Sequence, residues 1–304
     1  MMIIPPALKV NDTVAIVAPA GKPDQDLLEA GIAVLQLWGL HVRRGKNIYS
    51  QSHGYMAGTD AERLQDLQDM LNDEQISAVF CARGGYGCSR IADELDLNKC
   101  LHHPKWLIGY SDITALHLKF LKAGLASIHG EVPVHFARAS YAQGVNQLKA
   151  LLFGESAEIK SAVHQLQRNG FAQGNLVGGN LSLLVDALGT KTDFDSKGKV
   201  LVLEEIDEYY YKVDRMLTQL LRAGKLDNLA GLVIGQFSSM KDTKQAFNES
   251  VAEIVMHKVS PFTYPVAFNF PIGHEPFNLS WIHGARVALN VNAEGAAFSY
   301  INNE

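Results

Sequence analysis

Short apolar segments alternate with segments of helical periodicity over the first 120 or so residues of this 304-residue chain. The apolar segments have the length of buried strands, and the segments between them repeat apolar residues every three or four positions, as amphipathic helices do. Strands that alternate with helices pair in parallel and are covered on both faces. We therefore expect an α/β domain with a mostly parallel sheet. The expected strands are 12–19, 40–44, 76–82 and 106–108, and the expected helices are 25–37, 59–70 and one reaching residue 95.

The chain is long enough for two domains, and a second series of elements begins at residue 174. Asn180 is expected to cap an apolar helix, because asparagine is favoured at N-caps. We therefore expect an amino-terminal domain at 1–155, a linker at 156–173 and a carboxy-terminal domain at 174–304. The remaining expected elements are helices at 143–152, 181–188, 211–223 and 251–259, strands at 199–205, 229–237 and 265–270, and a hairpin of 285–291 with 297–301.

Composition argues against several classes of partner. The formal charge of −5 comes with both signs scattered, so no basic face for nucleic acid is expected. No apolar run approaches the roughly 20 residues of a membrane span, and the first residues lack the pattern of a secretory signal. The three cysteines, Cys81, Cys88 and Cys100, lack the spacing of zinc or redox sites. The sequence therefore predicts a cytoplasmic protein that binds neither nucleic acid nor membrane.

Ser111 lies on a turn between an expected strand and an expected helix. A serine there projects its hydroxyl from the carboxyl edge of the sheet, close to helical N–H groups that suit a developing oxyanion. Ser111 is therefore either a nucleophile or simply the N-cap of the helix, since serine is favoured there. The pattern Gly109-Tyr-Ser-Asp-Ile113 lacks the second glycine of the Gly-x-Ser-x-Gly elbow.

The glycine-rich segment Arg83-Gly-Gly-Tyr-Gly87 follows the third expected strand. It and Ser111 thus fall at carboxyl ends of strands, where open α/β sheets bind ligands. The segment lacks the Lys-Ser/Thr of a phosphate loop. Its backbone N–H groups could converge on an oxyanion beside Ser111, and a tight turn that requires glycine is the alternative.

A serine nucleophile needs a base, and His274 stands out among the 11 histidines because it follows an expected strand and a proline-glycine turn. Its candidate partners are Glu204 and Glu205, at the end of an apolar strand where an ionised carboxylate is costly unless paired. A carboxylate that fixes the tautomer of a histidine meets that need. The alternatives are a surface histidine and a salt bridge from the glutamate to Arg215.

Together these segments resemble the LD-carboxypeptidase family, serine peptidases that include murein tetrapeptide carboxypeptidase and the microcin C immunity peptidases. The resemblance runs across nearly the whole chain, and the joint order and spacing of its motifs is specific. The motifs are Val17–Gly21, Gly58–Leu67, Ala82–Gly87, Gly109–Thr114, Gly178–Leu181, Leu203–Glu205 with Val213–Leu217, and Gly273-His274.

The resemblance implies a flavodoxin-like amino-terminal domain, a smaller β-rich α/β carboxy-terminal domain and a homodimer. It also implies a triad of Ser111, Glu204 (less readily Glu205) and His274, and an oxyanion hole formed by the backbone N–H groups of Gly85 and Asp112. The family's peptidoglycan members remove the terminal D-alanine from murein tetrapeptides during cytoplasmic wall recycling, without a metal or cofactor.

Arg83 and Tyr86 are expected substrate contacts, and the guanidinium of Arg83 could bind a carboxylate bidentately. One alternative function is that of a microcin immunity-type peptidase, which hydrolyses peptidyl or aminoacyl adenylate analogues with the same triad. The tyrosines at 209–211 keep that alternative open, because it requires an aromatic platform for a nucleobase. A non-catalytic binding protein on the same fold is the alternative from another class.

We predict that peptidase activity survives chelation with EDTA and needs no added nucleotide, because the sequence holds neither zinc-ligand spacing nor a complete phosphate loop. His129, Glu131 and His135 form the only cluster that could contradict this prediction. The measurement is turnover before and after dialysis against EDTA. Activity that is lost on chelation and restored by zinc would indicate metal-assisted hydrolysis.

Overall fold

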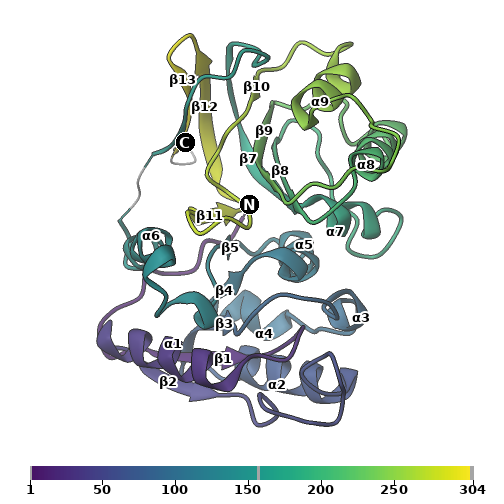
Figure 1. Cartoon of the computed structure of the whole chain (residues 1–304). Coiled ribbons are helices and arrows are strands. Elements are labelled where there is room, and N and C mark those ends of the chain that lie inside the picture. Colours follow the sequence, from purple (N-terminus) through teal and green to yellow (C-terminus); the bar gives the residue numbers. More distant parts are fainter. Residues whose placement is uncertain (1, 156–157, 302–304) are drawn as a thin grey trace. The chain divides into compact units, whose positions relative to one another are not determined.

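The computed structural model describes residues 2–155 and 158–301, which form two compact units (Figure 1). Unit 1 contains the chain up to the gap at 156–157, together with Gly189–Thr192 and Pro276–Gly284. Unit 2 contains most of the chain that follows the gap. The expected domain boundaries stay a prediction. The contacts within the chain assign 276–284 to unit 1, and part of the expected linker, 156–173, is strand.

The sheet of unit 1 has the strand order β11-β5-β4-β3-β1-β2. The strands are β1 (Thr13–Val17), β2 (His41–Arg44), β3 (Ile76–Cys81), β4 (Trp106–Gly109), β5 (Ser127–His129) and β11 (Trp281–His283). Strands β1 to β5 are parallel in the order 2-1-3-4-5, the flavodoxin-like order, and β4 is buried along its whole length. The predicted fold class is therefore confirmed.

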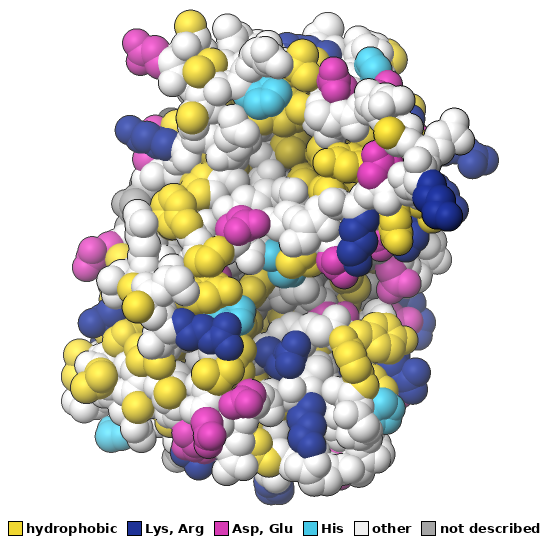
Figure 2. All heavy atoms as spheres, in the orientation of Figure 1, with side chains coloured by type: hydrophobic (Ala, Val, Ile, Leu, Met, Phe, Trp, Pro, Cys, Tyr) yellow, Lys and Arg dark blue, Asp and Glu magenta, His cyan; other side chains and the backbone are white. Residues whose placement is uncertain are grey.

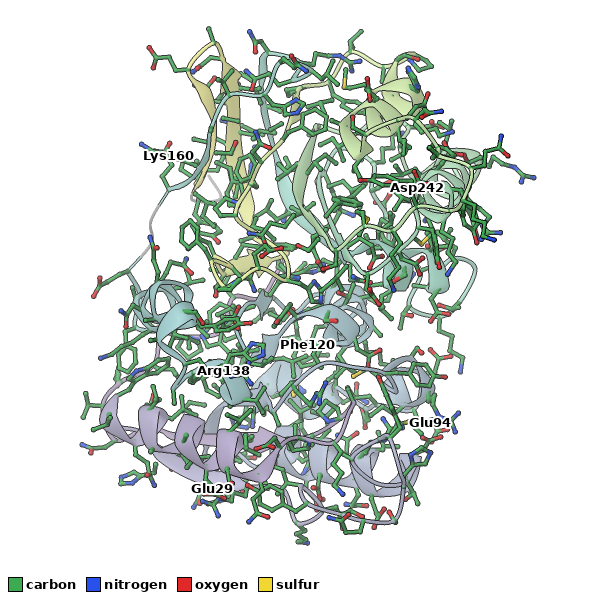
Figure 3. The ribbon with its side chains drawn as sticks, viewed as in Figure 1. Glu29, Glu94, Phe120, Arg138, Lys160 and Asp242 are labelled. Carbon is green, nitrogen blue, oxygen red and sulfur yellow. The ribbon has the colours of Figure 1, made fainter. Side chains whose placement is uncertain are left out.

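Two helices of unit 1, α1 and α2, begin at residues whose side chains cap them. The Asp24 side chain accepts from the Leu27 N–H, and Thr59 with Glu62 forms a capping box. Phe120 on α5 is fully buried (Figure 3). The helices are α1 (Gln25–Leu37), α2 (Asp60–Asn72), α3 (Ser89–Ala92), α4 (Asn98–His102), α5 (Thr114–Lys122) and α6 (Ala142–Leu152), with short 3-10 helices η1 (Ser111–Ile113), η2 (Pro133–His135) and η3 (Ala139–Tyr141).

The sheet of unit 2 has the strand order β10-β9-β8-β7-β12-β13-β6. Strands β7 to β10 are parallel, and β12, β13 and β6 continue the sheet in antiparallel pairs. Its elements are β6 (Ile159–Ser161), β7 (Gly170–Asn180), α7 (Leu181–Asp186), β8 (Val200–Ile206), α8 (Tyr210–Arg222), β9 (Gly231–Ser238), α9 (Val251–Val259), β10 (Val266–Ala267), β12 (Arg286–Asn292) and β13 (Gly295–Tyr300).

Several elements differ from the sequence-based expectations. Strands β5, β6 and β11 and helix α4 were not expected, because each is only three to five residues long and too short for a periodic pattern. Strand β10 covers two residues of the expected six, and the left-handed backbone of Asn269 (φ +61°) is incompatible with its continuation. The helix expected to reach residue 95 is the shorter α3.

Strand β11 brings a distant part of the chain into the sheet of unit 1. It pairs antiparallel with β5, where Trp281 lies opposite His129. The Trp281 ring is fully buried and stacks on His129 at a centroid distance of 5.2 Å. Residues that closely follow His274 in sequence are thus part of the core of unit 1.

We predict that Trp281→Ala lowers the free energy of unfolding by about 3–5 kcal/mol, because removal of a buried aromatic side chain leaves a cavity. Leu37→Ala is the matched control, since Leu37 is 83% exposed at the end of α1. Its effect should stay within about 0.5 kcal/mol. Chemical denaturation followed by far-UV circular dichroism measures both. Equal effects of the two variants would contradict a core role for β11.

Candidate active site

Ser111 occupies the turn between β4 and α5 with a strained backbone. It is the first residue of η1, is half-buried and has φ +64°, a left-handed conformation that is uncommon for residues other than glycine. An N-cap residue has an extended backbone and a side chain that accepts from the helix, whereas neither η1 nor α5 has a side-chain cap. The geometry contradicts the N-cap alternative and is that of a serine exposed on a sharp strand-to-helix turn.

Ser111 is held against the glycine-rich loop that follows β3. A Cβ added at Gly84 would lie 3.0 Å from the Cβ of Ser111 and 3.3 Å from its Oγ, so any other residue here would push Ser111 away by a few tenths of an ångström. The Gly84 carbonyl accepts a hydrogen bond from the N–H of Gly21, which follows β1, at 3.1 Å. The carboxyl ends of β1, β3 and β4 therefore meet around the Ser111 hydroxyl.

Two backbone N–H groups in this region are the candidate oxyanion hole. Within the described part of the chain, the N–H of Gly85 makes no hydrogen bond. The N–H of Asp112 belongs to the first turn of η1, where N–H groups lack a helical acceptor. Both groups can therefore donate to an oxygen that carries negative charge, and their role in an oxyanion hole stays a prediction.

In unit 2, His274 and Glu204 form a hydrogen-bonded pair. The distance from Nδ1 of His274 to Oε2 of Glu204 is 2.8 Å, and the Glu204 side chain is fully buried. The His274 side chain is 11% exposed. With its Nδ1–H donated to Glu204, the imidazole has its unprotonated nitrogen at Nε2, the tautomer that a general base requires.

The backbone of β9 holds the His274 loop against β8. The register of β8 and β9 shifts between Leu203 and Glu205, next to Glu204. At Gly235 an added Cβ would lie 2.3 Å from the Ile272 carbonyl oxygen, so glycine lets the loop approach the strand. The N–H of Gln236 donates to this carbonyl at 2.7 Å, and the Gln236 side chain accepts from the Glu275 N–H at 3.0 Å. His274 is thereby fixed by bonds on both sides of it.

Glu205 has a different set of partners. Its carboxylate accepts from the Asn180 side chain at 2.9 Å, from the Ser182 N–H at 2.8 Å and from the Ile206 N–H at 2.9 Å. Burial is the main cause that raises the pKa of Glu205, followed by the charge of Glu204. Glu205 thus anchors the start of α7, and Glu204 is the glutamate that contacts His274. Arg215, the alternative partner for either glutamate, lies over the ring of Tyr211 at 5.4 Å.

The predicted substrate contacts lie on the glycine-rich loop of unit 1. Arg83 is exposed, and its Nη1 donates to the Lys22 carbonyl at 3.2 Å. Tyr86 is 49% exposed. Both side chains are accessible to a ligand, and their contact with substrate stays a prediction.

The sequence correctly places Asn180 as the cap of α7, because its side chain accepts from the Leu183 N–H. Sequence reasoning missed three side-chain contacts that position this machinery: the bond from the Asn180 amide to Glu205, the bond of Gln236 to the His274 loop, and the bond of the Asp112 carboxylate to Cys88. Asn180 and Asp112 lie inside the family motifs Gly178–Leu181 and Gly109–Thr114, and this position could have indicated a role at the site. Gln236 is an ordinary strand residue by sequence, and only the loop packed against it reveals its part.

The cluster of His129, Glu131 and His135 is engaged within unit 1. Glu131 is fully buried and accepts from the Asn278 amide at 3.0 Å, and its second oxygen lies 3.0 Å from Nδ1 of His135. Among residues 2–155 and 158–301, no group of three or more His, Cys, Asp or Glu side chains is arranged to hold a metal ion. The prediction that activity is independent of metal is tested by chelation.

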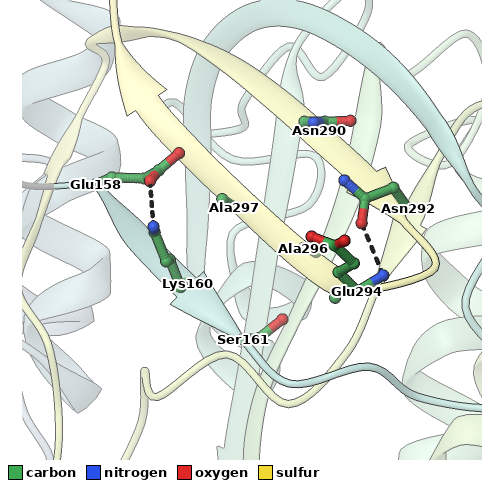
Figure 4. A pocket seen from close by; sticks show the side chains of 9 residues that line it. Glu158, Lys160, Ser161, Asn290, Asn292, Glu294, Ala296 and Ala297 are labelled. Carbon is green, nitrogen blue, oxygen red and sulfur yellow. Dashed lines mark hydrogen bonds and ion pairs between the residues drawn. The ribbon is translucent and has the colours of Figure 1, made fainter.

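Two surface features of the described chain lie apart from these residues. On the face that Figure 2 shows, basic and acidic side chains are interspersed. A polar pocket of about 260 Å³ lies at the end of the unit 2 sheet that β12, β13 and β6 form, and β7 separates these strands from β8 (Figure 4). An ion pair of Glu158 with Lys160 at 2.8 Å borders it.

No helix in the described residues is both long and apolar enough to cross a bilayer.

Comparison with known proteins covers both units. The sequence model of the LD-carboxypeptidase N-terminal domain matches residues 14–130, and that of the C-terminal domain matches 173–289. The chain belongs to the LD-carboxypeptidase family. It contains both domains of this family of serine carboxypeptidases, the N-terminal domain first. Ser111 lies in the match to the N-terminal domain, and Glu204 and His274 lie in the match to the C-terminal domain.

Relatives in the family are similar over most of their length. A probable murein peptide carboxypeptidase of Bacillus subtilis is 38% identical over 296 residues, which cover 94% of this chain and 91% of the relative. The murein tetrapeptide carboxypeptidase of Pseudomonas aeruginosa is 31% identical over 293 residues, or 93% and 94% of the two chains. The crystal structure of muramoyltetrapeptide carboxypeptidase from Oxalobacter formigenes has a TM-score of 0.87 at 27% identity and covers 95% of this chain and 99% of that chain.

We predict different effects when Glu204 and Glu205 are each replaced by glutamine. Glu204→Gln should fold normally but lower kcat by about 10⁴, the size of effect seen when the orienting acid of a serine protease triad is replaced by its amide. Glu205→Gln should keep most activity and lower the free energy of unfolding by about 1–3 kcal/mol, because an amide cannot accept from all three donors.

The two variants are compared by kcat in a peptidase assay and by denaturant unfolding of the same preparations. An inactive Glu205→Gln beside an active Glu204→Gln would reverse the two roles.

Proposed function

We propose that the chain is a serine carboxypeptidase that releases the terminal D-alanine from murein tetrapeptide by cleaving the amide between diaminopimelate and D-alanine. The observation that carries this proposal is the membership of both units in the LD-carboxypeptidase family, with relatives named for murein peptides at 31–38% identity. The strained Ser111 and the Glu204–His274 pair support it, since they are the parts that acyl transfer requires.

In the proposed mechanism, Nε2 of His274 takes the proton of the Ser111 hydroxyl as Oγ attacks the carbonyl carbon of the scissile amide. Glu204 holds the imidazole in the required tautomer and stabilises the imidazolium that forms. The N–H groups of Gly85 and Asp112 donate to the oxygen that becomes negative.

The tetrahedral intermediate collapses as the C–N bond breaks, and the imidazolium gives its proton to the departing amine of D-alanine. This leaves an ester between Ser111 and diaminopimelate. His274 then removes a proton from water, which attacks the ester, and the serine hydroxyl is restored when the proton returns.

A carboxypeptidase must also recognise the free carboxylate of the leaving residue. We propose Arg83 for this role, because its guanidinium is exposed on the loop that carries Gly85 and can bind a carboxylate bidentately. Tyr86, half-exposed on the same loop, would border the bound peptide.

The microcin immunity-type activity has less support. That alternative was left open by the tyrosines at 209–211. The Tyr209 and Tyr211 rings lie 5.7 Å apart, with Lys212 over the first ring and Arg215 over the second. This arrangement is one of side-chain packing along the start of α8. A non-catalytic binding protein would have no need for the hydrogen-bonded pair of His274 and the buried Glu204.

We further propose that the protein acts in the cytoplasm as a homodimer, as the family resemblance implies. The three free cysteines, all buried, fit a reducing compartment. Size-exclusion chromatography with light scattering tests the dimer.

We predict that Ser111→Ala abolishes D-alanine release and leaves the fold intact, because the hydroxyl is half-buried on a turn and caps no helix. Mass spectrometry of murein tetrapeptide before and after incubation measures the release, and a thermal melt of the same preparation reports the fold. A folded Ser111→Ala variant that still releases D-alanine would exclude Ser111 as nucleophile. Wild-type protein that leaves the tetrapeptide intact would contradict the proposed substrate.

A further inference from the structure

A buried cation and a buried anion hold two adjacent residues at the end of the glycine-rich loop: the cation binds Gly87, and the anion binds Cys88. Arg63 on α2 supplies the cation, and its side chain is fully buried. Its Nη1 donates to the Gly87 carbonyl at 2.8 Å and also to the carbonyl of Pro19, which follows β1. One guanidinium therefore joins the loops after β1 and β3.

The guanidinium packs directly on the loop backbone. A Cβ added at Gly87 would lie 2.6 Å from Nη1 of Arg63, so no other residue fits there without a shift. Nη2 of Arg63 pairs with Asp60, which in turn binds Arg90 at 2.7 Å. Both terminal nitrogens of the Arg63 guanidinium are therefore held in place, Nη1 by backbone carbonyls and Nη2 by Asp60.

Asp112 supplies the anion. Its side chain is 1% exposed, and its Oδ2 accepts from the Cys88 N–H at 2.8 Å. Burial raises the pKa of Asp112, against the lowering effect of hydrogen bonds from Cys88 and from the Gly87 N–H. The carboxylate accepts from the loop backbone and from the Cys88 side chain, an arrangement that fixes the loop relative to the residue next to Ser111.

We propose that Arg63 and Asp112 are positioning residues that hold the Gly85 N–H where the oxyanion forms beside Ser111. The backbone of Asp112 is one candidate oxyanion donor, and its carboxylate anchors the loop that carries the other donor two residues before Gly87. Asp112 binds an N–H group of this loop, whereas Arg63 binds a carbonyl group of it, that of Gly87. This inference rests on the serine chemistry of the proposed function.

A displaced donor affects the transition state more than the bound substrate, because the oxygen carries its full negative charge only in the tetrahedral state. The inference therefore predicts a loss in kcat with little change in KM. A role in stability alone predicts a lower free energy of unfolding with kcat retained in the folded fraction. The two roles are thus separable by experiment.

The test uses Asp112→Asn and Arg63→Lys. The asparagine side chain has one acceptor oxygen where the carboxylate has two, and a lysine lacks the forked donors that reach two carbonyls. Asp66→Asn is the matched control. Like Arg63, Asp66 is a buried residue of α2, and its carboxylate accepts from the Asn47 N–H at 2.7 Å. The loop that contains Asn47 carries no candidate site residue.

Two measurements are made on each folded variant: kcat and KM for murein tetrapeptide, and the rate at which a fluorophosphonate labels Ser111, followed by intact mass. We expect both substitutions to lower kcat and the labelling rate by about 10²-fold with KM little changed, the scale that a displacement near 1 Å produces. Asp66→Asn should change kcat and the labelling rate by no more than about twofold, because we expect this substitution to affect stability alone.

The inference is overturned if folded Asp112→Asn and Arg63→Lys match wild type, if they match Asp66→Asn, or if only KM changes. Failure of both variants to fold would also overturn it, since the residues would then serve stability. Wild-type protein that labels at Ser111 but does not cleave the tetrapeptide would refute the proposed substrate, and the labelling rates would still decide the inference. Wild-type protein that does neither would overturn both.

Discussion

Burial of a carboxylate is costly unless donors satisfy it, and the chain buries three of them next to its candidate catalytic residues. Asp112, Glu204 and Glu205 are each at most 2% exposed. Each accepts a hydrogen bond from a part of the chain that the site needs in place: Asp112 from the glycine-rich loop, Glu204 from the His274 ring, and Glu205 from the start of α7. The cost of burial thus becomes a constraint on loop position, because a displaced loop would leave a charge without its donors.

The second constraint is steric and acts on the backbone. Ser111 has a left-handed conformation that costs free energy, and such a conformation persists only where the surrounding structure holds it, as the close packing of Gly84 does here. Gly84 contacts the serine closely, and Gly235 admits the carbonyl of Ile272. In both units, a glycine allows a loop to approach the end of a buried parallel strand, and a hydrogen bond to the same region then fixes it.

The path of the chain explains how one short segment serves both units. His274 belongs to unit 2, where β9 and Glu204 hold it, and the chain then enters unit 1, in which Trp281 and its neighbours extend the parallel sheet by an antiparallel strand. Residues 276–284 contribute buried side chains to the core that carries Ser111. A change in this segment therefore affects the stability of unit 1, although the histidine just before it is part of unit 2.

The sequence by itself determined the parallel sheet of unit 1, the place of Ser111 on a strand-to-helix turn and the family, because these follow from local periodicity and from motifs in a fixed order. It also determined that Glu204 or Glu205 needs a partner at the end of an apolar strand. The family resemblance favoured Glu204 over Glu205, but strand alternation could not choose between them because both faces of β8 are buried. Only the tertiary structure shows the contact between Glu204 and His274. Strand β11 and the carboxylate bonds of Asp112 likewise depend on residues far apart in sequence, whose contacts leave no local pattern.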